Sequence, residues 1–255
     1  MRASRLSAMF LLAASAGAAV AAGAHARGRP ITVSAPVVQT MIVGRGGQPL
    51  FGERSVPAAA TTVPVHGRSC SVASATPLAV LAGARREGGP AFVLRDYGSC
   101  GSSAQSSSEL YVVSVGGEAA AAASGWEYKV NGTAGSTGAG DPSGPRGNGR
   151  RPSGGAQVLW FWCEHSSSGC QHTLELSAPT LVSPGQSVPV SVTGADDEGQ
   201  RFAVARVDIV LAGVSASSGA SGRARLRAPA APGRYRLTAS RAGLVPAFPV
   251  TVTVR

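Results

Sequence analysis

The sequence has one lysine, four histidines and few acidic residues, so the side chains that most often serve as catalytic groups are scarce. Lys129 is the only lysine among 23 lysine and arginine residues, against 13 aspartates and glutamates. The chain has no Gly-x-Ser-x-Gly nucleophile turn, no His-Glu-x-x-His pair and no phosphate-binding glycine-rich loop. We therefore expect a protein that is not an enzyme.

A secreted hydrolase is the weaker interpretation. It would rely on His66 or His165, and a triad with Asp96 or Asp141 is formally open. No spacing in the sequence favours such a triad.

The formal net charge is +10, and nearly all of the positive charge is arginine. Together with the high alanine and glycine content, this bias is typical of a GC-rich genome and is a weak indicator of a nucleic-acid partner, so we expect none. A basic surface would still be attracted to anionic cell-wall polymers by an interaction that salt screens.

Residues 1–26 have the pattern of an export signal. Arg2 and Arg5 precede an apolar stretch from Ala8 to Gly23. Ala24-His25-Ala26 then places small residues at the positions that a signal peptidase reads. A spanning helix needs about 20 apolar residues, which disfavours a retained anchor. We expect cleavage after Ala26 and a secreted, extracellular product, free or loosely associated with the cell wall, with no membrane insertion.

Four cysteines follow this leader: Cys70, Cys100, Cys163 and Cys170. An even number in an exported chain predicts two disulfide bonds, with three pairings open. Chain order favours Cys70 with Cys100 and Cys163 with Cys170, because both pairs close short loops. Each bond would stabilise the fold by about 2–4 kcal/mol.

The second cysteine pair also allows a metal site. Cys163, His165, Cys170 and His172 are residue types that bind zinc tetrahedrally. An oxidising compartment favours the disulfide, so we expect no metal, and we expect both histidines at the surface.

Residues 27–172 are predicted to form an α+β first domain with one helix packed on a sheet. Thr76-Pro77 is a favourable helix start and Arg85-Arg86 a favourable end, after which Gly88-Gly89-Pro90 stops the helix. The predicted strands are Ile31 to Val43, Ala91 to Asp96, Leu110 to Val115, Gly125 to Val130 and Gln157 to Cys163. The stretch from Gly47 to Arg68 has no clear pattern, and Thr133 to Gly155 is predicted to be an exposed loop.

Residues 173–255 are predicted to form an all-β sandwich as a second domain. Short alternating segments recur at regular spacing between Gly and Pro turns, which is typical of this architecture. The predicted strands are Val188 to Val192, Ala203 to Leu211, Ala224 to Ala228, Tyr235 to Ala239 and Val250 to Val254. The fold class is therefore mainly β.

The large aromatic residues are concentrated in two predicted strands. Trp126 and Tyr128 share one strand face, and the Asn131-Gly132 turn follows them directly. Trp160 and Trp162 share a face of the last strand of the first domain, with Leu159 and Phe161 on its other face. Core packing is the favoured interpretation, and a platform for a flat ligand such as a corrin or a sugar ring is the alternative. The candidate ligand-binding residues are Trp126, Tyr128, Asn131, Trp160 and Trp162.

Arginines also align on single strand faces. Arg223, Arg225 and Arg227 share one face, as do Arg234 and Arg236. A stripe that holds polyanions is one interpretation, and a solvated strand face in an arginine-rich chain is the favoured one.

The helix Thr76 to Arg86, the segment Gly125-Trp-Glu-Tyr-Lys-Val-Asn-Gly132, Gly138-Ala-Gly-Asp141 and the strand Val158 to Trp162 occur in this order. Residues 31–165 therefore resemble a bacterial domain family related to the C-terminal β-domain of transcobalamin and intrinsic factor, which has a Gly-Trp-x-Tyr-x-Val-Asn-Gly hairpin. The resemblance implies a ligand face and cobalamin as its possible ligand. The helical-barrel domain that covers the other face of the corrin in those carriers has no counterpart here. The insertion Pro142 to Gly155 also replaces the family's Leu-x-x-Gly-Asp turn.

The second domain is similar to immunoglobulin-like or carboxypeptidase-regulatory-like sandwiches. The similarity rests on two segments, Gly222-Arg-Ala-Arg-Leu and the one that begins with Pro232-Gly233. We expect a secreted or cell-surface binding module for a small molecule, such as a corrinoid, or for a cell-wall polymer. The alternative is a structural or adhesive scaffold without a small ligand.

Overall fold

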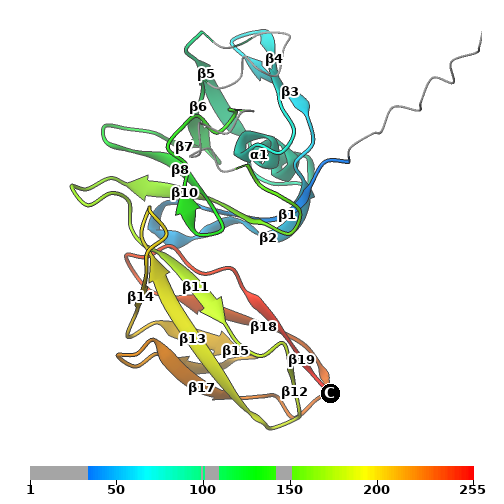
Figure 1. Ribbon diagram of the computed structural model, residues 1–255, viewed down its shortest axis with the longest axis vertical. Coiled ribbons are helices and arrows are strands. Elements are labelled where there is room, and N and C mark those ends of the chain that lie inside the picture. The colour runs from blue at the N-terminus through cyan, green and yellow to red at the C-terminus, as the bar shows by residue number, and fades with distance from the viewer. Residues whose placement is uncertain (1–33, 99, 101–108, 142–150) are drawn as a thin grey trace, which may run out of the picture. The chain divides into compact units, whose positions relative to one another are not determined.

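The most apolar strand of the sequence lies inside the main sheet of the amino-terminal part, residues 34–172. This strand, β10 (Gln157–Glu164), pairs in parallel with β1 (Val37–Val43) and antiparallel with β8 (Ser124–Val130). With β2 (Pro49–Pro57) and β9 (Thr133–Ala134) the order is β2-β1-β10-β8-β9. The computed structural model in Figure 1 describes residues 34–98, 100, 109–141 and 151–255.

The predicted helix is confirmed as α1 (Pro77–Arg86), which packs on β1, β2 and β10. The Thr76 hydroxyl accepts a hydrogen bond from the Ala79 amide (3.2 Å), as its cap position requires. All side chains from Pro77 to Ala84 are buried. This helix closes one face of the sheet, which is the face that carries Trp160 and Trp162.

Two small sheets complete the amino-terminal part. One pairs β3 (Thr61–Val65) with β4 (Arg68–Val72), and the other has the order β5 (Phe92–Asp96), β6 (Leu110–Val115), β7 (Glu118–Ala119). A disulfide from Cys70 to Cys100 joins β4 to the segment that follows β5. A single 3-10 turn, η1 (Arg45–Gly47), connects β1 to β2.

The carboxy-terminal part, residues 173–255, consists of two sheets (Figure 1). The first contains β11 (Thr173–Ser177), β13 (Ser187–Ala195), β14 (Arg201–Ala203) and β17 (Arg223–Arg227). The second has the order β12 (Leu181–Val182), β19 (Val250–Val254), β18 (Gly233–Ser240), β15 (Asp208–Leu211), β16 (Val214–Ser217). Their inner faces share one aliphatic core, in which Val188, Ile209, Leu237 and Val252 are fully buried. The mainly β fold and the sandwich-like arrangement are confirmed.

The Asn131-Gly132 turn has the backbone that its sequence predicts. Both residues have positive φ angles, 50° and 82°, as a two-residue hairpin turn of the favoured kind requires. The Asn131 side-chain oxygen also accepts a hydrogen bond from the Gln157 amide (2.9 Å), so the turn is fixed to the start of β10.

Two predicted strands differ from the structure in their bounds, and one stretch without a clear sequence pattern contains strands. The segment from Gly47 to Arg68 contains β2, β3 and part of β4. In β2 the alternation of buried and exposed residues is interrupted, because this strand pairs with β1 through an irregular register. The predicted strand Ala203 to Leu211 is two strands in different sheets, because the chain crosses the sandwich between them, with Arg206 at a φ of 56°. The first strand begins at Val37, and Ile31 to Val33 lie outside the described residues.

The prediction of an exposed loop over Thr133 to Gly155 was wrong for its first part. After the short strand β9, Ala139 is buried in the core, and its carbonyl accepts a hydrogen bond from the Leu78 amide (2.9 Å). Small side chains allow this segment to approach α1 closely. Residues 142–150 lie outside the described residues, and residues 151–155 form no helix or strand and are exposed apart from Pro152, as predicted.

An apolar contact joins the sheet of the amino-terminal part to the carboxy-terminal part. Met41, Leu159 and Phe161 face away from α1 and pack with Val245 and Phe248. Both faces of β10 are thus buried, which explains its uninterrupted apolar sequence.

Residues Ser34–Arg255 form one compact unit, although the strand pairings of the described residues do not cross residue 172. The domain boundary between residues 172 and 173 stays a prediction. The expected leader, residues 1–26, lies outside the described residues. Within the described residues, no helix has the length and hydrophobicity needed to traverse a bilayer.

Candidate functional site

Four of the five candidate ligand-binding residues are aromatic, and they form two cross-strand pairs. Trp160 lies opposite Tyr128 with ring centroids 5.6 Å apart, and Trp162 lies opposite Trp126 at 5.9 Å. Between 1% and 4% of each residue is exposed, so none of these rings offers a flat surface to solvent. Most of the surface of these residues is therefore buried in the core, as the favoured interpretation expects.

Each polar atom on three of these rings has a backbone partner. The indole N–H of Trp126 donates to the Glu118 carbonyl (2.8 Å), and that of Trp160 donates to the Pro77 carbonyl (3.1 Å). The Tyr128 hydroxyl donates to the Thr137 carbonyl (3.0 Å). These bonds fix the rings against the start of α1 and against the segment 135–139.

A cavity of about 340 Å³ opens beside these rings. Trp126, Tyr128 and Trp160 form its aromatic wall, and the segment 135–139 lies across from them. Glycine is required at position 135, because a Cβ atom there would lie 1.9 Å from the Tyr128 hydroxyl oxygen. Two candidates are not part of the lining: Asn131 holds its turn to β10, and the Trp162 ring lies under the Arg45 guanidinium at 4.0 Å.

Sequence reasoning missed two tyrosines at this site. Tyr111 lines the cavity and is 42% exposed, and its ring meets that of Tyr97, 61% exposed, edge to face at 6.4 Å. Burial raises the pKa of Tyr111, and the nearby Glu127 carboxylate raises it further. The signal was present, because Tyr111 lies between the inward-facing Leu110 and Val112 and so must face outward.

Glu127 lies where this cavity meets a second one of about 450 Å³. The second cavity is lined by Phe161, His165, Cys170, Asp197 and Glu198 as well as Glu127. Burial raises the pKa of Glu127, His165 opposes that rise and Asp197 adds to it. The His165 Nε2 atom lies 3.5 Å from the Glu127 carboxylate, and this is the only histidine–carboxylate ion pair in the described part of the chain.

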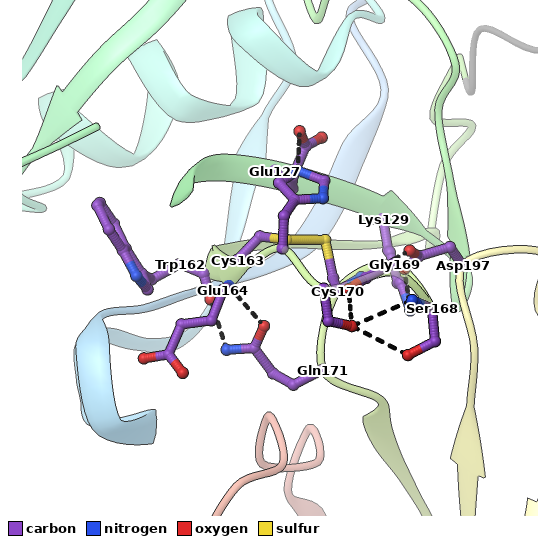
Figure 2. The surroundings of a disulfide bond; sticks show 12 residues. Glu127, Lys129, Trp162, Cys163, Glu164, Ser168, Gly169, Cys170, Gln171 and Asp197 are labelled. Atoms are coloured by element: carbon purple, nitrogen blue, oxygen red, sulfur yellow. Dashed lines mark hydrogen bonds and ion pairs between the residues drawn. A yellow bond between two sulfur atoms is a disulfide. The ribbon is translucent and has the colours of Figure 1, made fainter. Parts of the chain in front are cut away.

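The only lysine lies on the same face of β8 as Glu127, two residues further on (Figure 2). Lys129 Nζ is 2.7 Å from the Asp196 carbonyl and 3.2 Å from the Asp197 carboxylate, and the side chain is 1% exposed. Burial lowers its pKa, and the Asp197 carboxylate opposes that shift. The ammonium group therefore anchors the turn after β13 to the main sheet of the amino-terminal part.

The expected disulfides are both present: Cys70 with Cys100 and Cys163 with Cys170. Figure 2 shows the second bond between β10 and the loop that leads to β11, where the Cys170 amide donates to Asp197 (3.1 Å). The possible ligand atoms of Cys163, His165 and Cys170 lie within 4.8 Å of one another. Because zinc binds cysteine as a thiolate, these residues could form part of a metal site only when the disulfide is reduced.

The two histidines of this loop differ in exposure. His165 is exposed, as predicted. His172 is half-buried against the ring of Phe202 (4.6 Å), so it is less exposed than predicted. It packs there because the chain turns directly into β11.

The residues named for a hydrolase do not come together as a triad in the described residues. His66 lies in the β3–β4 turn with a φ of 47°, and Asp96 pairs with Arg68 and accepts hydrogen bonds from the Gly98 and Cys100 amides. The hypothesis of a protein that is not an enzyme remains untested by this arrangement.

No family model, curated protein or solved structure matches the chain. The resemblance to the transcobalamin-related domain family therefore stays a prediction that rests on the motifs from Gly125 to Gly132 and from Val158 to Trp162.

Proposed function

We propose that this chain is a secreted, non-enzymatic binding module that holds a small ring-shaped ligand in the aromatic cavity. The observation that carries the proposal is the cavity of about 340 Å³ beside Trp126, Tyr128 and Trp160. Small-molecule sites are typically concave, about 300–1,000 Å³ in volume, and mostly apolar with a few placed polar groups. Glu127 and the backbone of residues 135–139 supply such polar groups.

A sugar ring is the ligand class that best fits this lining. Its C–H face would stack on the exposed ring of Tyr111 and touch the edges of the aromatic wall, and its hydroxyls would donate to the Glu127 carboxylate and to backbone carbonyls. The volume suits one or two sugar rings, whereas a corrin macrocycle is much larger than the cavity. We therefore place cobalamin second among the ligands to test.

Export supports this assignment, because wall glycans would be accessible to the protein outside the cell. Two disulfides are compatible with an oxidising compartment. The export signal itself remains an inference from the pattern of residues 1–26.

Titration of the exported chain with N-acetylglucosamine, soluble wall disaccharides and cyanocobalamin tests the proposal. Tryptophan fluorescence reports binding because two indoles line the cavity, and calorimetry serves for the coloured corrinoid. We expect a saturable response to a sugar. Glu127→Gln should weaken binding about tenfold, since a hydrogen bond to a charged group is worth about 1.5–3 kcal/mol.

Glu164→Gln is the matched control, because Glu164 is exposed near the same end of the sheet and does not line either cavity. Its affinity should equal that of the unsubstituted chain. No response to any of these sugars, or an equal loss in both variants, would contradict the sugar site.

The rival function is a structural or adhesive scaffold, which the 1–4% exposure of the four aromatic residues favours. Fractionation separates the two. Retention on the wall together with a flat titration supports the scaffold, and a saturable titration supports the binding module.

A further inference from the structure

The outer face of the β13–β17 pair carries three arginines in a row. Arg223, Arg225 and Arg227 lie opposite Ser191, Pro189 and Ser187 in the antiparallel register. The alternate residue Leu226 is buried, as are Val188 and Val190. The arginines therefore stand on the solvent side of the sheet, beside small residues that leave their guanidinium groups uncovered.

These arginines have no acidic partner among the described residues. The arginine ion pairs among the described residues lie elsewhere, where Arg68 pairs with Asp96, Arg201 with Glu175 and Arg236 with Glu53. On β17 the only side-chain hydrogen bond in the described structure runs from Arg227 to the Gly185 carbonyl (3.2 Å). Three exposed positive charges thus remain available on one strand.

The surface next to this row is hollowed. Two depressions of about 410 and 250 Å³ share Pro189, Val190 and Arg223 and form one shallow groove. Arg223 and Arg225 line this groove, and Arg227 continues the row beyond it. Its far wall is the segment Ser177–Ala178–Pro179 at the end of β11. The described lining contains no acidic and no aromatic side chain.

We propose that this groove binds a linear phosphodiester polymer without bases, of the polyol-phosphate class found in bacterial envelopes. Arginine matches phosphate geometry through two parallel N–H donors. Alternate strand residues are about 6.6 Å apart, a spacing comparable to that of phosphates joined by a three-carbon linker. The favoured sequence interpretation of this strand as a merely solvated face does not account for the groove.

The absence of aromatic side chains from the described lining decides between phosphate polymers. Proteins that bind single-stranded nucleic acid combine a basic groove with rings on which the bases stack. This groove offers charge and small side chains, so a polymer without bases fits it better. The site is separate from the aromatic cavity, and the proposal does not depend on sugar binding there.

The test measures binding of a fluorescent poly(glycerol phosphate) oligomer by anisotropy at several salt concentrations. Three phosphate contacts predict a slope of log K against log salt of about −2, by the relation for single-stranded polyanions. The variant Arg223→Ser, Arg225→Ser, Arg227→Ser should lose at least tenfold in affinity, and its slope should approach zero.

The control variant Arg95→Ser, Arg234→Ser, Arg255→Ser removes the same charge from exposed positions outside the groove. It should keep most of the affinity for the polymer. An equal loss of affinity in both triple variants would show that binding depends only on net charge, and this would overturn the proposal. Oligo-dT or polygalacturonate bound as tightly as the phosphate polymer would also overturn it. Arg225→Ser alone, with about a threefold loss, serves if the triple variant does not fold.

Discussion

The two parts of the molecule bury their hydrophobic side chains in different ways. The carboxy-terminal part has an aliphatic core between two sheets, built from single inward-facing residues such as Val188 and Leu237. The amino-terminal part has one main sheet that is covered on both faces, by α1 on one side and by Val245 and Phe248 on the other. A sheet buried on both faces accommodates large rings, and the tryptophan-lined cavity of the described residues lies in this part.

Replacing one central residue in each core tests this difference most strongly. Trp160→Ala should destabilise the protein by about 4 kcal/mol and Leu237→Ala by about 3 kcal/mol, because the tryptophan leaves a larger cavity and also loses its hydrogen bond to Pro77. Urea unfolding followed by circular dichroism measures both. A smaller loss for Trp160→Ala than for Leu237→Ala would show that the aromatic core is the less tightly packed one.

The contact between the parts is tested by Lys129→Met. This change leaves Asp197 without its cation, and breaking a buried ion pair costs about 3–5 kcal/mol. The Asp197 side chain is 27% exposed, so we expect about 3 kcal/mol or slightly less.

A double-mutant cycle with Asp197→Asn isolates this interaction. A coupling of about 1–3 kcal/mol is expected between side chains in direct contact. Additive losses would mean that the lysine acts through its backbone carbonyl partners alone.

The smallest expected effect is a pH dependence at Glu127. Its pKa is raised above the usual 4.5, so the folded protein binds this proton more tightly than the unfolded chain. The stability that this group contributes is complete below pH 4.5 and is lost as the pH rises through the folded-state pKa. Glu127→Gln should therefore stabilise the protein at pH 7–8 and lose this advantage at pH 4.

Thermal unfolding across this pH range measures the effect. His165 lowers the pKa of Glu127 and so opposes the effect, and His165→Gln should therefore enlarge the advantage of Glu127→Gln. A Glu127→Gln variant that shows the same difference at every pH would contradict the assignment.

Local patterns were sufficient to predict α1, the β8 hairpin and most of the sandwich. Thr76-Pro77 places the start of the helix, and the alternation of Val250, Val252 and Val254 places the last strand, because each signal depends on the residue's own neighbours. The cysteine pairing also followed chain order.

Features that depend on distant partners were not predictable. Strand β2 was missed because its register with β1 is irregular, and the crossing near Arg206 interrupts a run that reads as one strand. The cavity depends on Gly135 and Ala139 lying over Tyr128 and α1, which no local pattern encodes. Sequence reasoning named Trp126, Tyr128 and Trp160 as candidates, whereas the place of Tyr111 and Glu127 beside the same cavity depends on the fold.

The burial of Lys129 determines how this protein responds to amine-directed chemistry. Lys129 is the only lysine of the sequence and its side chain is buried, so an acylating reagent reaches its amine only when the surrounding contacts open. Slow acylation of the lysine would in turn report how often the contact between the two parts opens.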